Sequence, residues 1–176
     1  MTTPATPVPD EKDWTWVLER PCPECGFDAS AITGADVAGQ LRTAIATLRS
    51  AVLAPDSNVR PQPTVWSALE YGCHVRDACI VFGTRLASMR HVNDPQFANW
   101  DQDQTALADR YWDQEPARVA DELSVECERI ADDFARVTDD EWQRPGRRSN
   151  GSVFTVDTLA RYLLHDAVHH VHDVAT

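Results

Sequence analysis

Apolar residues recur along this chain at intervals of three and four, which is the period of an amphipathic helix. The clearest stripe begins after Thr33, which we expect to be an N-cap paired with Asp36 three residues on. This pattern predicts a first helix that starts near Thr33 and is ended by Pro55. Its apolar positions are Val37, Leu41, Ile45, Leu48 and Val52.

Three later segments show the same period and predict three more long helices. We expect a second helix from about Ser67 to Met89, a third over about 116–138, and a last one from near Thr155 to the C-terminus. The proline-containing segment 54–64 is predicted to be a loop, and 91–114 a long connection with one short helix around 105–111. Connections of this length often line a site. With no strand pattern longer than a few residues, the fold predicted is an all-α four-helix bundle.

The residues before the first helix divide into two parts. Residues 1–13 are rich in Thr and Pro and are expected to form a flexible tail. Residues 14–32 are expected to form an ordered extension, because Trp14, Trp16 and Leu18 need an apolar surface to cover. The helical bundle itself is then expected over residues 33–176.

Composition and charge narrow the classes of function. The 176 residues are 43% apolar, which is enough for the core of one domain. A net charge of −12 argues against a nucleic-acid partner and against anionic membrane surfaces. The chain has no apolar run long enough to cross a membrane and no secretory signal at its start, so we expect a cytoplasmic protein. A homodimer is compatible with a bundle that exposes apolar faces.

The last predicted helix carries the pattern of residues most typical of a metal site. His165 and His169 are four residues apart, so both imidazoles project from one face of the helix and can reach one ion. Catalytic zinc sites usually take three protein ligands and leave one position open. Of the histidines outside this helix, His74 lies mid-helix beside the apolar Cys73, whereas His91 lies at a helix end. His74 is therefore the better third ligand.

Acidic residues near these histidines could support the ligands. Glu70 and Asp77 lie near the same helix face as His74 and could accept a hydrogen bond from a ligand imidazole. Asp166, beside His165, is a third candidate for this role. Glu70 could instead act as a general base. By contrast, His170 is expected to point away from the site. His172 could be a fourth contact, because it lies seven residues after His165, but we expect it to lie in solvent near the chain end.

The spacing of two histidines also occurs by chance, and an exposed His-rich helix end is the simpler alternative. Beyond spacing, Trp66-Ser67, Glu70, His74 and Asp77 together resemble the second-helix signature of the DinB/YfiT-like superfamily. The pair His165 and His169 resembles the final-helix signature of that superfamily, and Trp142 also fits. The resemblance covers roughly residues 33–174.

The resemblance implies an up-down-down-up bundle with one divalent metal ion, zinc or nickel, held by His74, His165 and His169. Some members of the superfamily resemble S-transferases or isomerases that use mycothiol, bacillithiol or glutathione, and others resemble metal hydrolases. The basic residues here are nearly all Arg, which would suit an actinobacterial source with mycothiol as its thiol.

The turn Cys22-Pro-Glu-Cys25-Gly26 has the spacing of one half of a zinc-binding knuckle. No second Cys pair completes it, so three interpretations stay open: a structural turn, a second metal site, or a redox pair. The odd count of five cysteines points to reduced thiols. We expect the other three to be small core residues.

A basic loop precedes the last helix and suggests a substrate contact. Arg147 and Arg148 could hold a carboxylate or phosphate of a substrate, although a solvated loop is the simpler interpretation. The segment beginning at Trp100 could line a metal cleft or pack the long connection onto the bundle.

Three functions are therefore compatible with the sequence. The first is a metalloenzyme that acts on a small molecule with a low-molecular-weight thiol, by S-transfer or isomerisation. The second is a hydrolase in which a water on the metal is activated by Glu70. The third is a non-catalytic metal- or ligand-binding protein of a stress response.

Overall fold

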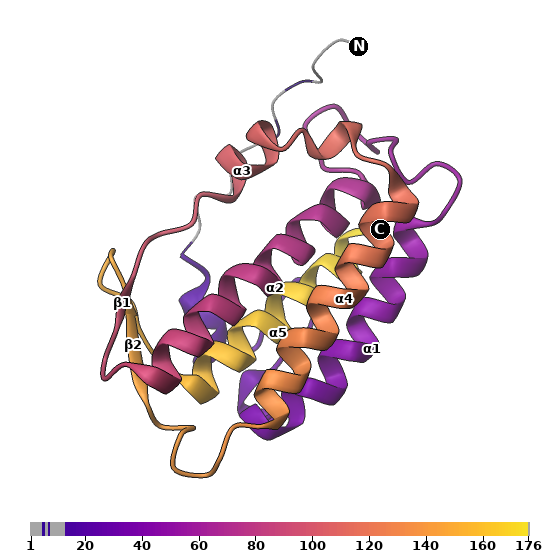
Figure 1. Ribbon diagram of the computed structural model, residues 1–176. Coiled ribbons are helices and arrows are strands. Elements are labelled where there is room, and N and C mark those ends of the chain that lie inside the picture. Colours follow the sequence, from indigo (N-terminus) through magenta and orange to yellow (C-terminus); the bar gives the residue numbers. More distant parts are fainter. Residues whose placement is uncertain (1–4, 6, 8–12, 176) are drawn as a thin grey trace.

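The computed structural model describes residues 5, 7 and 13–175. The expected flexible tail over 1–13 therefore lies almost entirely outside the described residues. Four long helices form the body: α1 (Gly34–Val52), α2 (Ala68–His91), α4 (Pro116–Ala135) and α5 (Val156–Asp173). Figure 1 shows α1 and α5 running in one direction and α2 and α4 in the other. The predicted up-down-down-up four-helix bundle is confirmed.

Contacts between helix ends fix this arrangement. The α1 start meets the α5 start, where the Gly34 N–H donates to Asp157 Oδ1 at 2.6 Å. The α2 and α4 ends meet, where Arg90 donates to the backbone carbonyl of Arg136 at 3.3 Å. Each of α1 and α2 packs against both α4 and α5. The core lies between these four helices.

Two of the helix starts show how the local sequence sets the bounds. Thr33 and Asp36 form the expected reciprocal capping box at the start of α1, in which the side chain of each residue accepts a hydrogen bond from the backbone N–H of the other. Ser67 and Glu70 form the same arrangement at the start of α2. Both caps satisfy N–H groups that a helix start leaves without partners. α1 ends at Val52, shortly before Pro55.

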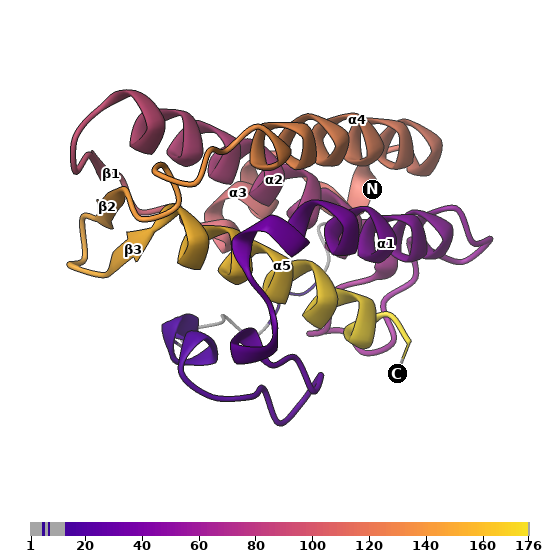
Figure 2. The same ribbon diagram turned by 90° about the horizontal axis from the view of Figure 1, so that it is seen from below.

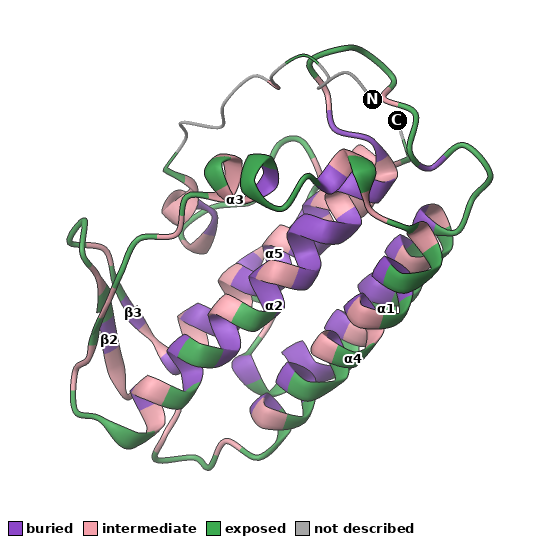
Figure 3. Ribbon diagram, turned by 45° about the horizontal axis from the view of Figure 1, so that its top comes forward, coloured by how far each residue is buried: buried purple, intermediate pink, exposed green. Residues whose placement is uncertain are grey.

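The long connection between α2 and α4 lies along α2 and covers part of it. It contains β1 (Gln96–Phe97), the short helix α3 (Gln102–Ala108) and the 3-10 helix η3 (Tyr111–Asp113). α2 is consequently buried over much of its surface, while α1 and α4 carry exposed outer faces (Figure 3). This explains why α2 has polar residues among its buried positions.

A small sheet ties the connection to the loop before α5. β2 (Pro145–Arg148) pairs in parallel with β1 and antiparallel with β3 (Val153–Thr155), giving the order β1-β2-β3. Phe97 is in register with Arg148. The sheet therefore fixes the place of the basic loop relative to α2.

The segment before α1 packs against the outer side of α5, where Figure 2 shows it in indigo. It contains the 3-10 helices η1 (Trp14–Leu18) and η2 (Ala29–Ala31), and η1 contacts α5 directly. Val17 and Cys22 are buried. None of the helices in the described residues is long and apolar enough to cross a membrane.

Gly72 in α2 gives a test of the packing. A Cβ at this position would lie 2.4 Å from Val52 Cγ2, so Gly72→Ala should lower the free energy of unfolding by about 1–3 kcal/mol through overpacking. Gly39 in α1 is the matched control, because a Cβ there would meet nothing within 4 Å. Gly39→Ala should raise the free energy of unfolding by roughly 0.5–1 kcal/mol through helix propensity. Urea denaturation followed by circular dichroism measures the free energy of unfolding of both variants. A change of the same sign in the two variants would contradict this packing.

Candidate metal centre

The C-terminal half of α5 presents two pairs of polar side chains at the spacing i, i+4. One pair is His165 and His169, and the other is Asp166 and His170. Because successive residues of an α-helix are rotated by about 100°, the two pairs project in different directions. Each pair meets different partners.

The first group consists of His74, Asp166 and His170. The His74 Nε2 lies 3.4 Å from Asp166 Oδ1, and the His170 Nε2 lies 3.7 Å from the same oxygen. With metal–ligand bonds of about 2.0–2.1 Å, two ligand atoms of a tetrahedral ion lie roughly 3.3–3.4 Å apart. Both nitrogens are thus close to the separation from the carboxylate oxygen that one ion requires, and one ligand atom from each of the three residues lies within 4.8 Å of the others.

The surroundings of this group hold the side chains in place. His170 Nδ1 is 2.8 Å from Asp173 Oδ2, which leaves Nε2 facing the group. Trp100 stacks on the His74 ring with centroids 5.3 Å apart. His74 Nδ1 and Asp166 Oδ2 are buried without a hydrogen-bond partner among the described residues.

The electrostatics of the group favour an ionised carboxylate. Burial by itself raises the pKa of Asp166, but the neighbouring His74 outweighs it, and the pKa lies below its usual range. Two imidazoles and one carboxylate are a donor set that suits zinc, nickel and similar ions. The residues present therefore fit a divalent metal.

The second group consists of Cys22, Cys25, His165 and His169. One potential ligand atom from each residue lies within 4.8 Å of all the others. Cys22 Sγ is 3.8 Å from His169 Nδ1. All of these residues are buried except Cys25, which is partly exposed.

Burial also sets the protonation of the second group. It lowers the pKa of His165 to about 4, with help from the neighbouring His169, whose own pKa is lowered by burial as well. Burial raises the pKa of Cys25 to about 11. At neutral pH and without a metal, these groups are therefore neutral imidazoles and a neutral thiol.

A cavity of about 810 Å³ adjoins both groups. Its volume is in the range of small-molecule sites. Asp166, His170, His165 and His169 contribute to its wall, as does Trp14. The segment that begins at Trp100 also lines it, through residues 100–103, as one of our two sequence-based alternatives suggested.

Two arginines give the cavity a cationic region. Arg85 and Arg148 both line it, and neither forms an ion pair within the described part of the chain. Arg85 is buried against Phe82 and Phe97. Burial, followed by the positive charge of Arg148, lowers the pKa of Arg85 to about 10.

The structure thus divides the three histidines predicted as ligands between two groups. His74 lies with Asp166 and His170, whereas His165 and His169 lie with the cysteine pair. His170 faces His74, at a ring-centroid distance of 4.8 Å, and does not point away as expected. The three-histidine site remains a prediction from the family resemblance, and the observed groups suggest a different assignment.

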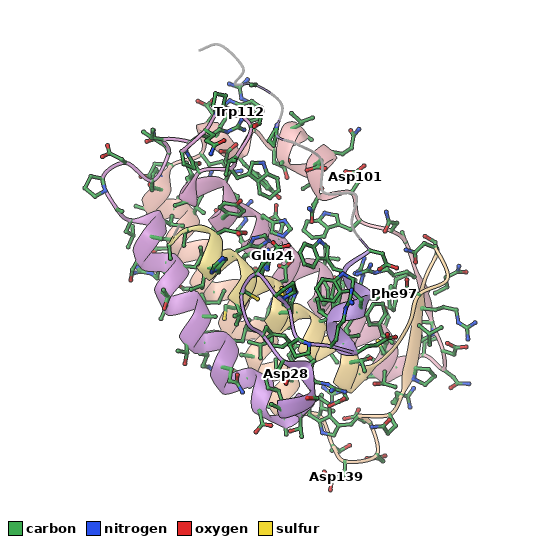
Figure 4. The ribbon with its side chains drawn as sticks, turned by 180° about the vertical axis from the view of Figure 1, so that it is seen from behind. Glu24, Asp28, Phe97, Asp101, Trp112 and Asp139 are labelled. Carbon is green, nitrogen blue, oxygen red and sulfur yellow. The ribbon has the colours of Figure 1, made fainter. Side chains whose placement is uncertain are left out.

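The two acidic residues expected beside His74 have other partners. Both oxygens of Glu70 accept hydrogen bonds from Arg60, and Oε2 also accepts one from the Ser67 N–H. Asp77 accepts hydrogen bonds from Arg76 and from the Tyr111 hydroxyl. Figure 4 instead labels Glu24 beside α5, where its carboxylate lies 3.5 Å from His169 Nε2.

The two candidate arginines of the basic loop differ in position. Arg148 lines the cavity and lies over the rings of Phe154 and Tyr162. Arg147 is an exposed neighbour that pairs with Asp94. No pattern in the sequence singles out Arg85, because its position in α2 does not indicate which residues cover it.

Comparison with known proteins agrees with the fold. The sequence model of the DinB superfamily matches residues 40–174 of the chain. A solved structure, described as YfiT from Bacillus subtilis, a probable metal-dependent hydrolase with an unusual four-helix bundle topology, is similar with a TM-score of 0.70 and 15% identity. The similarity covers 81% of this chain and 85% of that one. No curated protein matches the sequence.

The lowered pKa of His165 predicts a pH dependence of stability. His165 titrates near 6.5 when unfolded and at about 4 when folded, so the unfolded state binds more protons between these values. In metal-free protein, its contribution is present above pH 6.5 and is lost toward pH 4, at a cost on the order of 3 kcal/mol. Denaturation of the chelator-treated protein across this range measures it.

Two variants distinguish the contribution of His165 to the pH dependence of stability from the general effect of acid. His165→Gln should flatten the dependence, while a Gln at the exposed His91 should leave it unchanged. Equal pH profiles for wild type and His165→Gln would contradict the buried, neutral imidazole.

Proposed function

Since the chain belongs to the DinB superfamily, we propose that it binds a divalent metal ion with His74, Asp166 and His170 and acts on a small molecule in the adjoining cavity. The observation that carries this proposal is the meeting of three potential donor atoms, with Asp166 Oδ1 3.4 Å from one imidazole nitrogen and 3.7 Å from the other, at a cavity wall. Three protein ligands leave a coordination position for substrate.

The ion that we propose is zinc or nickel. Imidazole nitrogens suit both, and zinc sites with two histidines and one carboxylate are common in enzymes. When bound, such an ion supplies Lewis acidity and lowers the pKa of a coordinated thiol. Asp173 orients His170 through its Nδ1, and Trp100 limits the position of His74.

The reaction that we favour is transfer to or from a low-molecular-weight thiol, by substitution or isomerisation, with mycothiol as one candidate. In the substitution, the thiol loses its proton, its sulfur bonds to an electrophilic carbon, and the leaving group departs with the bonding electrons. The chain would bind both reactants and exclude water from them. Trp14 and Trp100 supply apolar cavity walls for this.

The cationic region of the cavity supports a substrate or thiol that carries an anionic group. Arg148 Nε is buried without a hydrogen-bond partner among the described residues, and Arg85 has one hydrogen bond, to the Ala98 carbonyl at 3.3 Å. The buried guanidinium of Arg85 and the partly buried one of Arg148 repel each other, and a carboxylate between them would relieve this repulsion. We therefore assign the anionic group of the ligand to Arg85 and Arg148.

A hydrolase is the second candidate, because the similar structure of YfiT is described as a probable metal-dependent hydrolase. Our sequence-based version of this function used Glu70 as the base. That carboxylate is buried and engaged with Arg60 and the start of α2, so it is poorly placed to accept a proton from water. The transfer reaction does not need it.

Metal analysis of purified protein tests the ligand set. His170→Ala and His74→Ala should each lower the bound metal by up to one equivalent, because each removes one of three ligands. His91→Ala is the matched control, since His91 is exposed at the end of α2 and belongs to neither group. Inductively coupled plasma mass spectrometry gives the metal content. Retention of wild-type metal content by both variants would overturn the assignment.

The anionic subsite predicts a selectivity between matched electrophiles. Wild type with mycothiol should turn over 4-chloro-3,5-dinitrobenzoate in preference to the uncharged 1-chloro-2,4-dinitrobenzene. Arg148→Gln should raise KM for the carboxylated compound roughly 10- to 100-fold, the loss of about 1.5–3 kcal/mol expected for a hydrogen bond between charged groups. Arg147→Gln should leave KM unchanged, because Arg147 pairs with Asp94 outside the cavity.

The outcomes of this assay separate the candidate functions. Equal effects of the two arginine variants would contradict the subsite. Bound metal without turnover of either electrophile, with any of the three thiols named above, would favour a non-catalytic binding protein. Release of product from an ester without thiol would favour the hydrolase.

A further inference from the structure

The cysteine turn before α1 has the backbone of a metal-binding knuckle. Cys22 N–H donates to the Phe27 carbonyl at 2.8 Å, and Gly26 N–H donates to the Cys22 carbonyl at 2.9 Å. Gly26 has a φ of +76°, a left-handed conformation that favours glycine. These bonds close a tight turn that presents both thiols to the same partner helix.

α5 supplies the two remaining donors from one face. His165 and His169 are held beneath Trp14, whose ring centroid is 5.4 Å from the first imidazole and 4.9 Å from the second. Phe27 contacts His165 from the turn itself, at 5.4 Å. The aromatic rings therefore fix both imidazoles beside the thiols.

The separations agree with a tetrahedral ion. With zinc–sulfur bonds of about 2.3 Å and zinc–nitrogen bonds of about 2.0–2.1 Å, a sulfur and a nitrogen ligand lie roughly 3.6 Å apart. The observed distance from Cys22 Sγ to His169 Nδ1 is 3.8 Å. The two remaining ligand atoms, from Cys25 and His165, need only small movements, since all four ligand atoms lie within 4.8 Å of one another.

Neighbouring groups also match a ligand environment. His169 Nε2, the nitrogen away from the thiol, lies 3.5 Å from Glu24 and 3.8 Å from Asp173, and such carboxylates commonly orient a metal-bound histidine. His165 Nε2 is buried and lacks a hydrogen-bond partner within the described residues. A buried polar atom of this kind costs free energy unless something binds it.

We propose that Cys22, Cys25, His165 and His169 bind one zinc ion in a closed, four-coordinate structural site that fastens the N-terminal extension to α5. Two thiolates and two imidazoles are a ligand set that zinc prefers in structural sites. Four protein ligands fill the coordination shell, so this ion is distinct in role from the one in the proposed catalytic site. The proposal does not depend on that function.

A redox role for the cysteine pair is less well supported by the structure. A disulfide-exchanging thiol must be reached by a partner thiol, yet Cys22 is only 1% exposed. Neither cysteine lines the cavity, although both histidines of the group do. The thiols thus face the histidines of α5 rather than a substrate.

The test compares metal content and cobalt spectra of the full-length protein, purified under reducing conditions. Wild type is expected to bind two equivalents of zinc, and Cys22→Ser/Cys25→Ser only one. Wild type reconstituted with Co²⁺ should show thiolate-to-cobalt charge-transfer absorption, which the double variant should lack. Cys127→Ser is the matched control, because Cys127 is a buried thiol of α4 outside both groups and should leave both readouts unchanged.

His74→Ala separates this proposal from the catalytic assignment. It should lose the other equivalent of metal but retain the cobalt–thiolate absorption. If His74→Ala retains all metal while the cysteine variant loses one equivalent, the structural site stands and the catalytic site fails. The reverse result overturns the structural site alone.

A measurement on wild type alone covers the case in which the cysteine variant does not fold. Titration of the native protein with p-hydroxymercuribenzoate should release one equivalent of zinc, detected with 4-(2-pyridylazo)resorcinol. The absence of thiolate absorption in the cobalt protein would overturn the proposal. So would a Cys22–Cys25 disulfide, detected by mass spectrometry, in purified protein that contains no zinc at this site.

Discussion

The candidate metal centre depends on one physical constraint: the fold removes several polar side chains of α5 from water. His165 and His169 are buried, and Asp166 and His170 are half-buried on the same two turns. Unsatisfied buried polar groups each cost roughly 1–3 kcal/mol, so a helix with this sequence needs compensating partners. The chain provides two sets of partners, one from α2 and one from the segment before α1. The bundle topology determines which set meets which pair.

The fold follows closely from local sequence, whereas the grouping of the ligands does not. The predicted helices match α1, α2, α4 and α5 to within a few residues, and the capping box at Thr33 lies where the sequence places it. Helical period and capping depend on residues three or four apart, which the sequence displays directly. The long connection was also expected to line a site, and it lines the cavity.

The choice among ligands depends on contacts that no short pattern contains. Both His165–His169 and Asp166–His170 have the i, i+4 spacing, and only packing decides which pair faces α2. Cys22 meets His169 from 147 positions away, so a lone cysteine knuckle could not reveal its complement. Glu70 shows the converse: its spacing from His74 suggests a base or a partner of a ligand imidazole, whereas the structure engages it in the cap of α2 and in an ion pair with Arg60.

Because α5 is covered from both sides, the two groups of potential ligands on it are mechanically linked. Trp14 contacts His165 and His169 and also forms part of the cavity wall, so the position of that wall depends on how the N-terminal extension is held. Asp173 approaches His169 on one side and His170 on the other, at 3.8 Å and 2.8 Å. One carboxylate therefore orients one imidazole of each group. Because a single rigid helix carries both groups, anything that fixes the extension against α5 also limits the motion of the side chains that face the cavity.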